Sequence, residues 1–124
     1  MTYRLSQRSM QNLSGVHPDL VAVVKRAIEI TEQDFSVIEG VRNIERQRQL
    51  VAKGASQTMN SRHLTGHAVD LAPYPLSWDW EYFYPIADAM KGAADELDVA
   101  IVWGGDWSTF KDGPHFELDR KVYP

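Results

Sequence analysis

The sequence predicts an α+β fold, in which a small antiparallel sheet has helices packed against it within a single compact domain, residues 1–124. Short β-rich stretches and longer stretches of helical periodicity interleave along the chain, but without the regular strand–helix–strand rhythm of a doubly wound sheet. Of its 124 residues 44% are hydrophobic, which is enough to bury a core without cross-links. Neither an internal repeat nor a linker divides the sequence, so we expect one domain.

The first half of the chain predicts two helices with a strand between them. Segment 16–19, Val-His-Pro-Asp, is typical of a helix start, because proline suits the first turn and an acid suits the positive helix end. Apolar residues then recur at helical spacing to about Thr31. A β-rich stretch follows at 35–41. Asn43 is expected to cap a second helix over 44–53, which the next glycine ends.

The second half predicts strands on both sides of one long helix. A polar loop at 55–60 precedes a strand at 68–72, which two prolines stop. Ser77 is expected to cap the long helix, and strands follow at 99–103 and 115–118, with a turn at two adjacent glycines between them. The helix is indicated by apolar residues three and four apart: Trp80, Phe83, Ala87, Met90, Ala94 and Leu97.

Composition excludes several classes of protein. The chain has no cysteine, so it has neither disulfides nor a thiolate metal site. A net charge of −4 argues against nucleic acid as a partner, because phosphate binders normally carry a basic patch. No apolar run is long enough to cross a membrane, and residues 1–12 lack the apolar stretch of a secretory signal. We therefore expect synthesis in the cytoplasm, with any export depending on another protein.

Two short segments hold the candidate metal ligands. Segment 61–70 reads Ser-Arg-His-Leu-Thr-Gly-His-Ala-Val-Asp, and segment 112–117 reads Asp-Gly-Pro-His-Phe-Glu. His63, Asp70 and His115 offer two imidazoles and a carboxylate, and three such ligands with an open fourth position are typical of a catalytic zinc site. We expect a loop to present His63 while two strands direct the other two ligands at the same centre.

Each of these residues also has a purely structural interpretation. Asp70 could be a buried acid paired with Arg62, and His63 could be a surface histidine. Taken singly, these interpretations are the more common ones. The three residues occur together, however, with Asp112 beside the last of them, and this combination favours a metal site.

The other two histidines are expected to have different roles. His67 follows His63 by four residues, as in the helical zincin motif, but Leu64 stands where that motif has its catalytic glutamate. Gly66 also disfavours a helix there. We therefore expect His67 to line the pocket or to hydrogen-bond a metal-ligating side chain, rather than to bind the metal itself. For His17 we expect a structural role at its helix start.

Peptide hydrolysis at such a site needs a group that moves a proton from water to the leaving amine. Asp112, three residues before His115, is the first candidate, although Asp-Gly-Pro also favours a simple turn. Glu117 is the second candidate. Since it shares a strand face with His115, it could instead orient that imidazole.

Four further features have open alternatives. Arg42 could stabilise an oxyanion or grip a substrate carboxylate, or it could form an ordinary salt bridge with Glu39 or Glu45. Ser61 could contact substrate or cap its loop. The run Trp103-Gly-Gly-Asp-Trp107 is expected to form one wall of the cleft. Its aspartate, Asp106, could hydrogen-bond a metal-ligating side chain, or it could simply belong to a turn. A cluster of aromatic residues could stack on sugars, but most of them are expected in the core: Trp78, Trp80, Tyr82, Phe83 and Tyr84.

The two metal segments resemble a known family. Ser-x-His-x-x-Gly-x-Ala-x-Asp and Asp-x-x-His are similar to the motifs of zinc peptidases of the D-alanyl-D-alanine carboxypeptidase type, whose fold is hedgehog-like. Within that group the chain looks most like the compact L-alanyl-D-glutamate endopeptidases used as phage endolysins. The likeness extends to other segments: Asn12–Leu20, Gly40-Val-Arg42, Gln47 and the run at 103–107.

This resemblance implies one Zn²⁺ on His63, Asp70 and His115, Asp112 as general base, and Arg42 at the substrate. The implied reaction is hydrolysis of the L-alanyl–D-glutamate bond in the stem peptide of peptidoglycan, by water that zinc activates. Asp112 would pass the proton to the leaving amine, while Arg42 helps with charge. Many relatives of the carboxypeptidase branch have glutamate at the position of Asp112, so the shorter acid fits the endolysin-like branch better.

Two alternative functions share this metal site. One is a D-alanyl-D-alanine carboxypeptidase or dipeptidase, and the other is a binding module that recognises wall peptides without cleaving them. The resemblance also implies a monomer that associates stably with neither membrane nor nucleic acid. Such a protein would remain in the host cytoplasm until a holin-like protein gave it access to the periplasm and cell wall at lysis.

Overall fold

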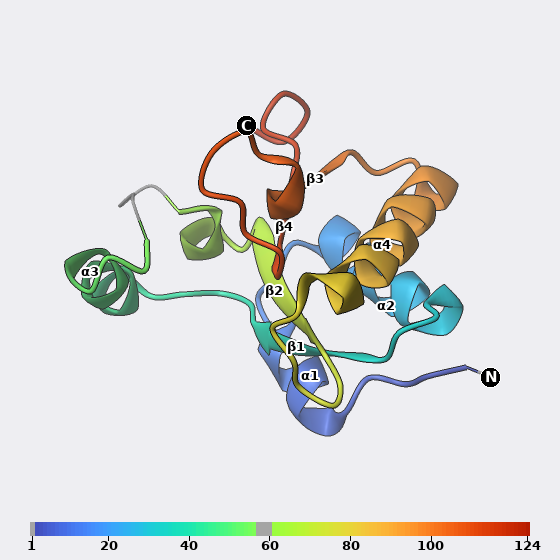
Figure 1. Cartoon of the computed structure of the whole chain (residues 1–124). Coiled ribbons are helices and arrows are strands. Elements are labelled where there is room, and N and C mark those ends of the chain that lie inside the picture. Colours follow the sequence, from blue (N-terminus) through green and yellow to red (C-terminus); the bar gives the residue numbers. More distant parts are fainter. Residues whose placement is uncertain (1, 57–60) are drawn as a thin grey trace.

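The structure is a computed structural model that describes residues 2–56 and 61–124. Its strands form a four-stranded antiparallel sheet in the order β1-β2-β4-β3 (Figure 1). The strands are β1 (Phe35–Glu39), β2 (Ala68–Pro73), β3 (Ile101–Trp103) and β4 (His115–Leu118). This sheet and the helices around it confirm the α+β class. The predicted loop at 55–60 lies partly outside the described residues, and the extent of the domain stays a prediction.

Four α-helices and three short 3₁₀ helices accompany the sheet. The α-helices are α1 (Gln7–Asn12), α2 (Pro18–Ile30), α3 (Ile44–Ala52) and α4 (Phe83–Leu97), and the 3₁₀ helices are η1 (Arg62–Thr65), η2 (Trp80–Tyr82) and η3 (Gly104–Asp106), all within the described ranges. The predicted cap at Asn43 is present, and His17 caps the helix whose start the segment 16–19 predicts. The Nδ1 atom of His17 accepts from the Asp19 amide at 3.1 Å, and Asn43 Oδ1 accepts from the Arg46 amide at 2.7 Å.

Helix α1 was not predicted, because its sequence Gln-Arg-Ser-Met-Gln-Asn has no apolar stripe. Polar contacts hold it instead. Ser6 caps it by accepting from the Ser9 amide at 3.0 Å. The buried Ser9 hydroxyl then accepts from the Val37 amide of β1, also at 3.0 Å. Asn12 Nδ2 also donates to the Val37 carbonyl, at 2.8 Å, so two polar side chains tie this helix to an edge strand of the sheet.

The prediction that Ser77 caps a long helix was wrong. Helix α4 begins at Phe83, after η2, and Ser77 accepts only from the Asp79 amide in the preceding turn. Pro85 explains the late start, because a proline is tolerated only in the first turn of an α-helix. Most of the nearby aromatic residues are consequently exposed rather than in the core: Trp78 60%, Trp80 41%, Tyr82 38% and Tyr84 54%, against 3% for Phe83.

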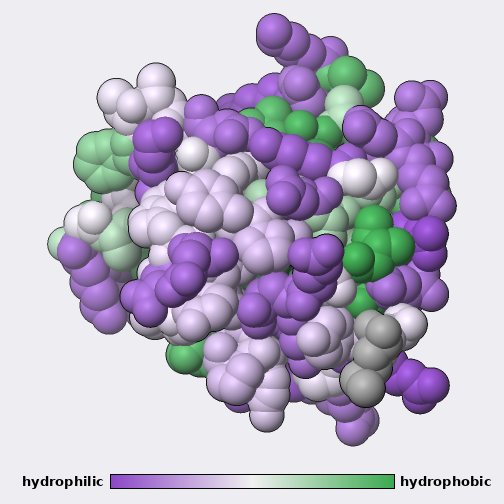
Figure 2. Space-filling model, turned by 45° about the vertical axis from the view of Figure 1, so that its right-hand side comes forward, coloured by the Kyte–Doolittle hydropathy of each residue, from purple (hydrophilic) through white to green (hydrophobic). Residues whose placement is uncertain are grey.

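Helices α2 and α4 lie side by side against one face of the sheet (Figure 1). That face supplies alternate residues of two central strands to the core: Val69 and Leu71 from β2, and Phe116 and Leu118 from β4. Each such side chain contributes about 1.5–3 kcal/mol by leaving water. On the side seen in Figure 2, hydrophobic residues form separate small areas among hydrophilic ones. The opposite face of β2 and β4 carries Asp70, His115 and Glu117 together with two buried alanines, Ala68 and Ala72.

Candidate metal centre and active site

The strand alternation that buries the core directs two candidate ligands to the opposite face. Asp70 on β2 lies directly across from His115 on β4 in the antiparallel register. Their neighbours Val69 and Phe116 point into the core. Because successive side chains of a strand alternate between faces, the carboxylate and the imidazole must share the face away from α2 and α4.

His63 reaches this face from η1, one turn of 3₁₀ helix, rather than from the predicted loop. Ser61 caps the turn by accepting from the His63 amide at 3.2 Å, which was one of its two predicted roles. Gly66 ends it with a φ of 75°, and a Cβ there would clash with the Gly15 carbonyl. The sequence Ser-x-His-x-x-Gly therefore fixes the start and the end of the turn that carries His63.

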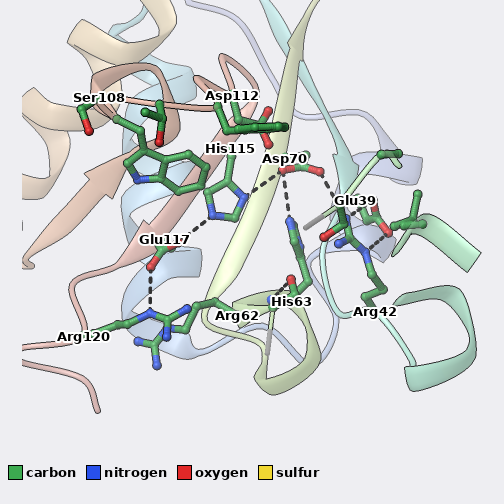
Figure 3. Close-up of a pocket in the computed structure, with 17 residues that line it drawn as sticks. Glu39, Arg42, Arg62, His63, Asp70, Ser108, Asp112, His115, Glu117 and Arg120 are labelled. Atoms are coloured by element: carbon green, nitrogen blue, oxygen red, sulfur yellow. Dashed lines mark hydrogen bonds and ion pairs between the residues drawn. The ribbon is translucent and has the colours of Figure 1, made fainter. Parts of the chain in front are cut away.

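The three side chains converge on one point (Figure 3). His63 Nε2 lies 3.1 Å and His115 Nδ1 lies 3.4 Å from the same oxygen, Asp70 Oδ1. One ligand atom from each residue lies within 4.8 Å of the others, and the two rings are 5.1 Å apart. Both histidines are buried, with exposed fractions of 2% and 6%. This group could bind a metal ion.

The outer ring nitrogens show that the donor set suits a cation. His63 Nδ1 lies 2.9 Å from the Gly40 carbonyl oxygen, which can only accept, so this nitrogen carries the proton. His115 Nε2 lies 2.8 Å from a Glu117 oxygen. With both imidazoles neutral and both outer nitrogens donating, the inner nitrogens would present lone pairs to a cation beside the Asp70 carboxylate. Such partners orient metal-binding histidines, and a cation at the centre satisfies all three inner atoms.

The pKa values of His115 and Asp70 are shifted by the hydrogen bonds and charges at this centre. Burial by itself lowers the pKa of His115, but hydrogen bonds and charge from Asp70 and Glu117 outweigh this and raise it to about 9. Burial acts to raise the pKa of Asp70, yet hydrogen bonds from His115 and His63 hold it well below its usual range. Without a metal, Asp70 and Glu117 therefore stabilise the protonated form of His115.

Asp112 lies at the same pocket, at the start of the turn that leads into β4. Its amide donates to the Gly104 carbonyl at 3.0 Å, and its own carbonyl accepts from the His115 amide at 3.2 Å. The turn interpretation is thus correct for its backbone. No side chain or backbone group within 2–56 and 61–124 hydrogen-bonds its carboxylate. Burial and the charge of Asp70 raise the pKa of Asp112, which favours a carboxyl able to exchange protons.

Arg42 forms the salt bridge with Glu39 and not with Glu45. Its Nε and Nη2 atoms each lie 2.8 Å from a Glu39 oxygen, and Nη1 donates to Gln47 Oε1 at 2.8 Å. The same guanidinium also lies 3.6 Å from Asp70 Oδ2, the oxygen that faces away from the histidines. Arg42 therefore balances the charge of the carboxylate and lines the pocket.

The alternative pair of Asp70 with Arg62 is not formed, since Arg62 donates to the carbonyls of Leu118 and Tyr123.

A pocket of about 650 Å³ surrounds these groups (Figure 3). It is lined by all five predicted site residues and by Glu117 and Ser61. The sequence did not indicate several other lining residues: Leu50, Ser108, Thr109, Phe110 and Arg120.

Trp107 is the one part of the run 103–107 that forms a wall, and its ring lies 5.1 Å from that of His115. Trp103 is buried and donates to the Gly113 carbonyl at 2.7 Å.

Two expected neighbours of the ligands lie elsewhere. His67 does not line the pocket; its Nδ1 lies 2.6 Å from Thr65 Oγ1, and its ring is 5.5 Å from that of His17. Asp106 is paired with Lys91 at 2.7 Å, as an exposed acid rather than a partner of a ligand.

Comparisons with known proteins identify the family of this chain. A family model described as phage L-alanyl-D-glutamate peptidase matches residues 1–123. The L-alanyl-D-glutamate peptidase of Escherichia phage T5 is 33% identical over 130 residues, covering 99% of this chain and 94% of that protein. The L-alanyl-D-glutamate peptidase of Listeria phage A118 is 32% identical over 127 residues, and the match covers 99% of this chain but 45% of that longer protein.

A solved structure extends the likeness to the whole fold. The crystal structure of the Serratia marcescens L-Ala D-Glu endopeptidase ChiX is 50% identical and superposes with a TM-score of 0.92, covering 98% of this chain and 94% of that one. The sheet and the helices therefore form the fold of that endopeptidase. This chain belongs to the phage L-alanyl-D-glutamate peptidase family.

Proposed function

We propose that this protein is a zinc-dependent endopeptidase that hydrolyses the L-alanyl–D-glutamate bond of peptidoglycan stem peptides, as an endolysin in bacterial lysis. The observation that carries the proposal is the centre itself. Two buried imidazoles direct their inner nitrogens at one carboxylate oxygen, and both outer nitrogens are held by acceptors. Family membership supports the choice of bond, since relatives are peptidases named for L-alanyl-D-glutamate.

His63, Asp70 and His115 would hold the metal. Two imidazole nitrogens and one carboxylate oxygen, with an open position toward a pocket, match the donor set of catalytic zinc sites. Zinc would supply Lewis-acid chemistry there, polarising the scissile carbonyl and acidifying water. The Glu117 carboxylate and the Gly40 carbonyl fix the two rings in the orientation that this requires.

Asp112 would move the proton in this reaction. Its carboxylate lines the pocket, and its raised pKa suits a group that takes a proton from water and gives it to the leaving amine. Glu117 is the weaker candidate, because its oxygens already face His115 at 2.8 Å and Arg120 at 3.6 Å. Arg42 would stabilise negative charge that develops on the substrate beside Asp70.

Incubation of purified protein with purified peptidoglycan, with zinc or with a chelator, tests the proposal. Mass spectrometry of the products should show new amino termini at D-glutamate, with L-alanine left on the muramyl side, only in the zinc samples. Release of D-alanine would instead indicate a D-alanyl-D-alanine carboxypeptidase with the same centre. Binding to the wall by zinc-loaded protein without any cleavage would indicate a binding module.

The role in lysis is a separate part of the proposal. Among the helices in the described ranges, none is long and apolar enough to span a bilayer. We propose that the protein acts as a monomer and reaches the wall only after a holin-like protein opens the membrane. Expression in host cells with and without a pore-forming protein tests this, and lysis without the pore would contradict it. Light scattering of the purified protein measures the oligomeric state.

A further inference from the structure

One side of the pocket is formed by a short surface loop, residues 107–111, which we call the rim loop. It is closed at its base, because the amides of Trp107 and Asp112 both donate to the carbonyl of Gly104, at 3.3 and 3.0 Å. A Cβ on Gly104 would clash with the backbone of Asp112, so the close approach of the two chain segments at the base requires glycine at this position. The loop thus projects directly beside the candidate proton carrier.

Phe110 at the tip of the rim loop has two unfavourable features. Its side chain is 67% exposed, the largest fraction given for any apolar residue within the described ranges. Its φ of 51° lies in the left-handed region, which a bulky residue rarely adopts. Exposure forgoes the free energy of burying the ring, and the backbone adds strain. Neither feature serves the core, but the residue lines the pocket, where a ligand would cover the ring.

The chemistry of the rim loop is that of a neutral, partly apolar ligand. It offers the rings of Trp107 and Phe110 and the exposed hydroxyls of Ser108 and Thr109, all of which line the pocket. Its one charged group, the Lys111 ammonium, points back to the Gly105 carbonyl at 3.5 Å. Aromatic faces attract weakly positive C–H groups, and hydroxyls bind other hydroxyls or amides. A pyranose ring with an acetamido group presents both kinds of surface.

The position of the loop relative to the centre fits the proposed substrate. The ring of Trp107 lies 5.1 Å from that of His115, and Figure 3 shows Ser108 on the side of the centre opposite to Arg42. In a stem peptide, L-alanine is joined directly to the lactyl group of the muramyl sugar. One residue spans at most about 3.6 Å, so a substrate bound with its L-alanine toward the rim loop brings the sugar within reach of this wall.

We propose that the rim loop is a saccharide subsite, in which Phe110 and Trp107 cover the N-acetylmuramyl ring that carries the stem peptide. The proposal rests on the proposed function, which it deepens from a peptide-bond specificity to a requirement for the attached sugar. Phe110 is then a specificity-determining residue, and its exposure and backbone strain are offset when substrate binds.

The test compares two substrates with zinc-loaded protein: a muramyl tripeptide, and the same tripeptide with an acetyl group in place of the muramyl group. The quantity measured is the ratio of their kcat/KM values. In Phe110→Ala this ratio should fall about tenfold, the effect of leaving roughly half of a phenylalanine surface uncovered. Phe110→Tyr retains a flat ring and should keep the wild-type ratio. Tyr74→Ala removes an aromatic side chain that is 55% exposed but lies outside this pocket, and it should also keep the ratio.

An unchanged ratio in Phe110→Ala would overturn the proposal, whether both rates fall equally or neither changes. An equal fall of the ratio in Tyr74→Ala would overturn it too. If the wild-type protein cleaves neither substrate, the proposed function fails, and a second measurement then decides the subsite. Titration with N-acetylmuramic acid should shift the backbone amide resonances of the rim loop in the wild type and not in Phe110→Ala. Absence of such shifts in the wild type would contradict a saccharide subsite.

Discussion

The chain contains two pairs of neighbouring histidines, and only one of them forms a candidate metal centre. The rings of His63 and His115 are 5.1 Å apart, and those of His17 and His67 are 5.5 Å apart. In the first pair, Asp70 lies between the rings, within 3.1 and 3.4 Å of their inner nitrogens. In the second pair no carboxylate lies between the rings among the residues that the structure describes.

The outer nitrogens separate the pairs further. Those of His63 and His115 are held by the Gly40 carbonyl and by Glu117. In the other pair, the Nδ1 atom of His17 accepts a helix-capping hydrogen bond from the Asp19 amide. The pKa of His67 is lowered by burial and by the charges of Arg62 and His17. Two close imidazoles are therefore insufficient for a metal centre. A shared carboxylate and acceptors behind each ring make the difference.

The largest expected effect comes from removing the shared carboxylate. Asp70→Asn keeps the size of the side chain but removes the charge that both histidines and Arg42 face. We expect loss of bound zinc, measured by elemental analysis, and loss of cleavage to the level seen with chelator. A variant that keeps one zinc per chain would show that the two imidazoles suffice, which would remove the distinction between the pairs.

Asp112→Asn should separate metal binding from proton transfer. Since Asp112 is not among the converging ligand atoms, the zinc content should stay at the wild-type level. Loss of the general base should lower kcat by about 10²–10⁴-fold. Steady-state rates with a muropeptide substrate measure the effect, with circular dichroism as the control for folding. Retained turnover would transfer the base role to Glu117.

The acceptor behind His115 should have an intermediate effect. Glu117→Ala removes the partner of the outer nitrogen, and zinc affinity should fall about 10–100-fold. Glu117→Gln retains an acceptor oxygen without the charge, so its affinity should lie between those of the wild type and the alanine variant. Competition with a chromophoric chelator measures both. Equal affinities for all three proteins would show that the acceptor has no part in defining the centre.

The second histidine pair should give the smallest effects, and on stability rather than on metal. His17→Ala removes the cap of α2 and should lower the free energy of unfolding by about 1 kcal/mol, while His17→Asn keeps a capping group and should lose less. Urea titration measures both. His67→Ala should leave zinc content and cleavage unchanged. A drop in zinc content in that variant would mean that His67 contributes to the centre after all.

Local patterns were sufficient to predict several features of the fold. The start of α2 and the cap at Asn43 depend on contacts two and three residues away, so their predicted positions were correct. The alternation in β2 and β4 likewise placed Asp70 and His115 on one face. The start of α4 was wrong, although Pro85 was a local signal that could have corrected it. Helix α1 has no apolar stripe, and polar contacts from Ser9 and Asn12 hold it to a distant strand.

By itself, the sequence determined the chemistry of the candidate centre: two imidazoles and a carboxylate in two motifs, with an acid three residues before the last histidine. Ligation by these residues stays a prediction, but the structure brings all of them to one pocket. Only the tertiary structure decided which atoms complete the centre. The Gly40 carbonyl behind His63 and the Arg42 guanidinium beside Asp70 come from positions more than 20 residues away.

The tertiary structure also decided which aromatic rings are available to a ligand. Residue type predicts burial for Trp80 and Phe110 alike, yet both are exposed, and of these two only Phe110 lines the pocket. The physical reason is that burial and neighbourhood are set by how strands and helices pack over long sequence separations. Cap and turn contacts between nearby residues are fixed by the sequence itself, whereas a pocket wall is not.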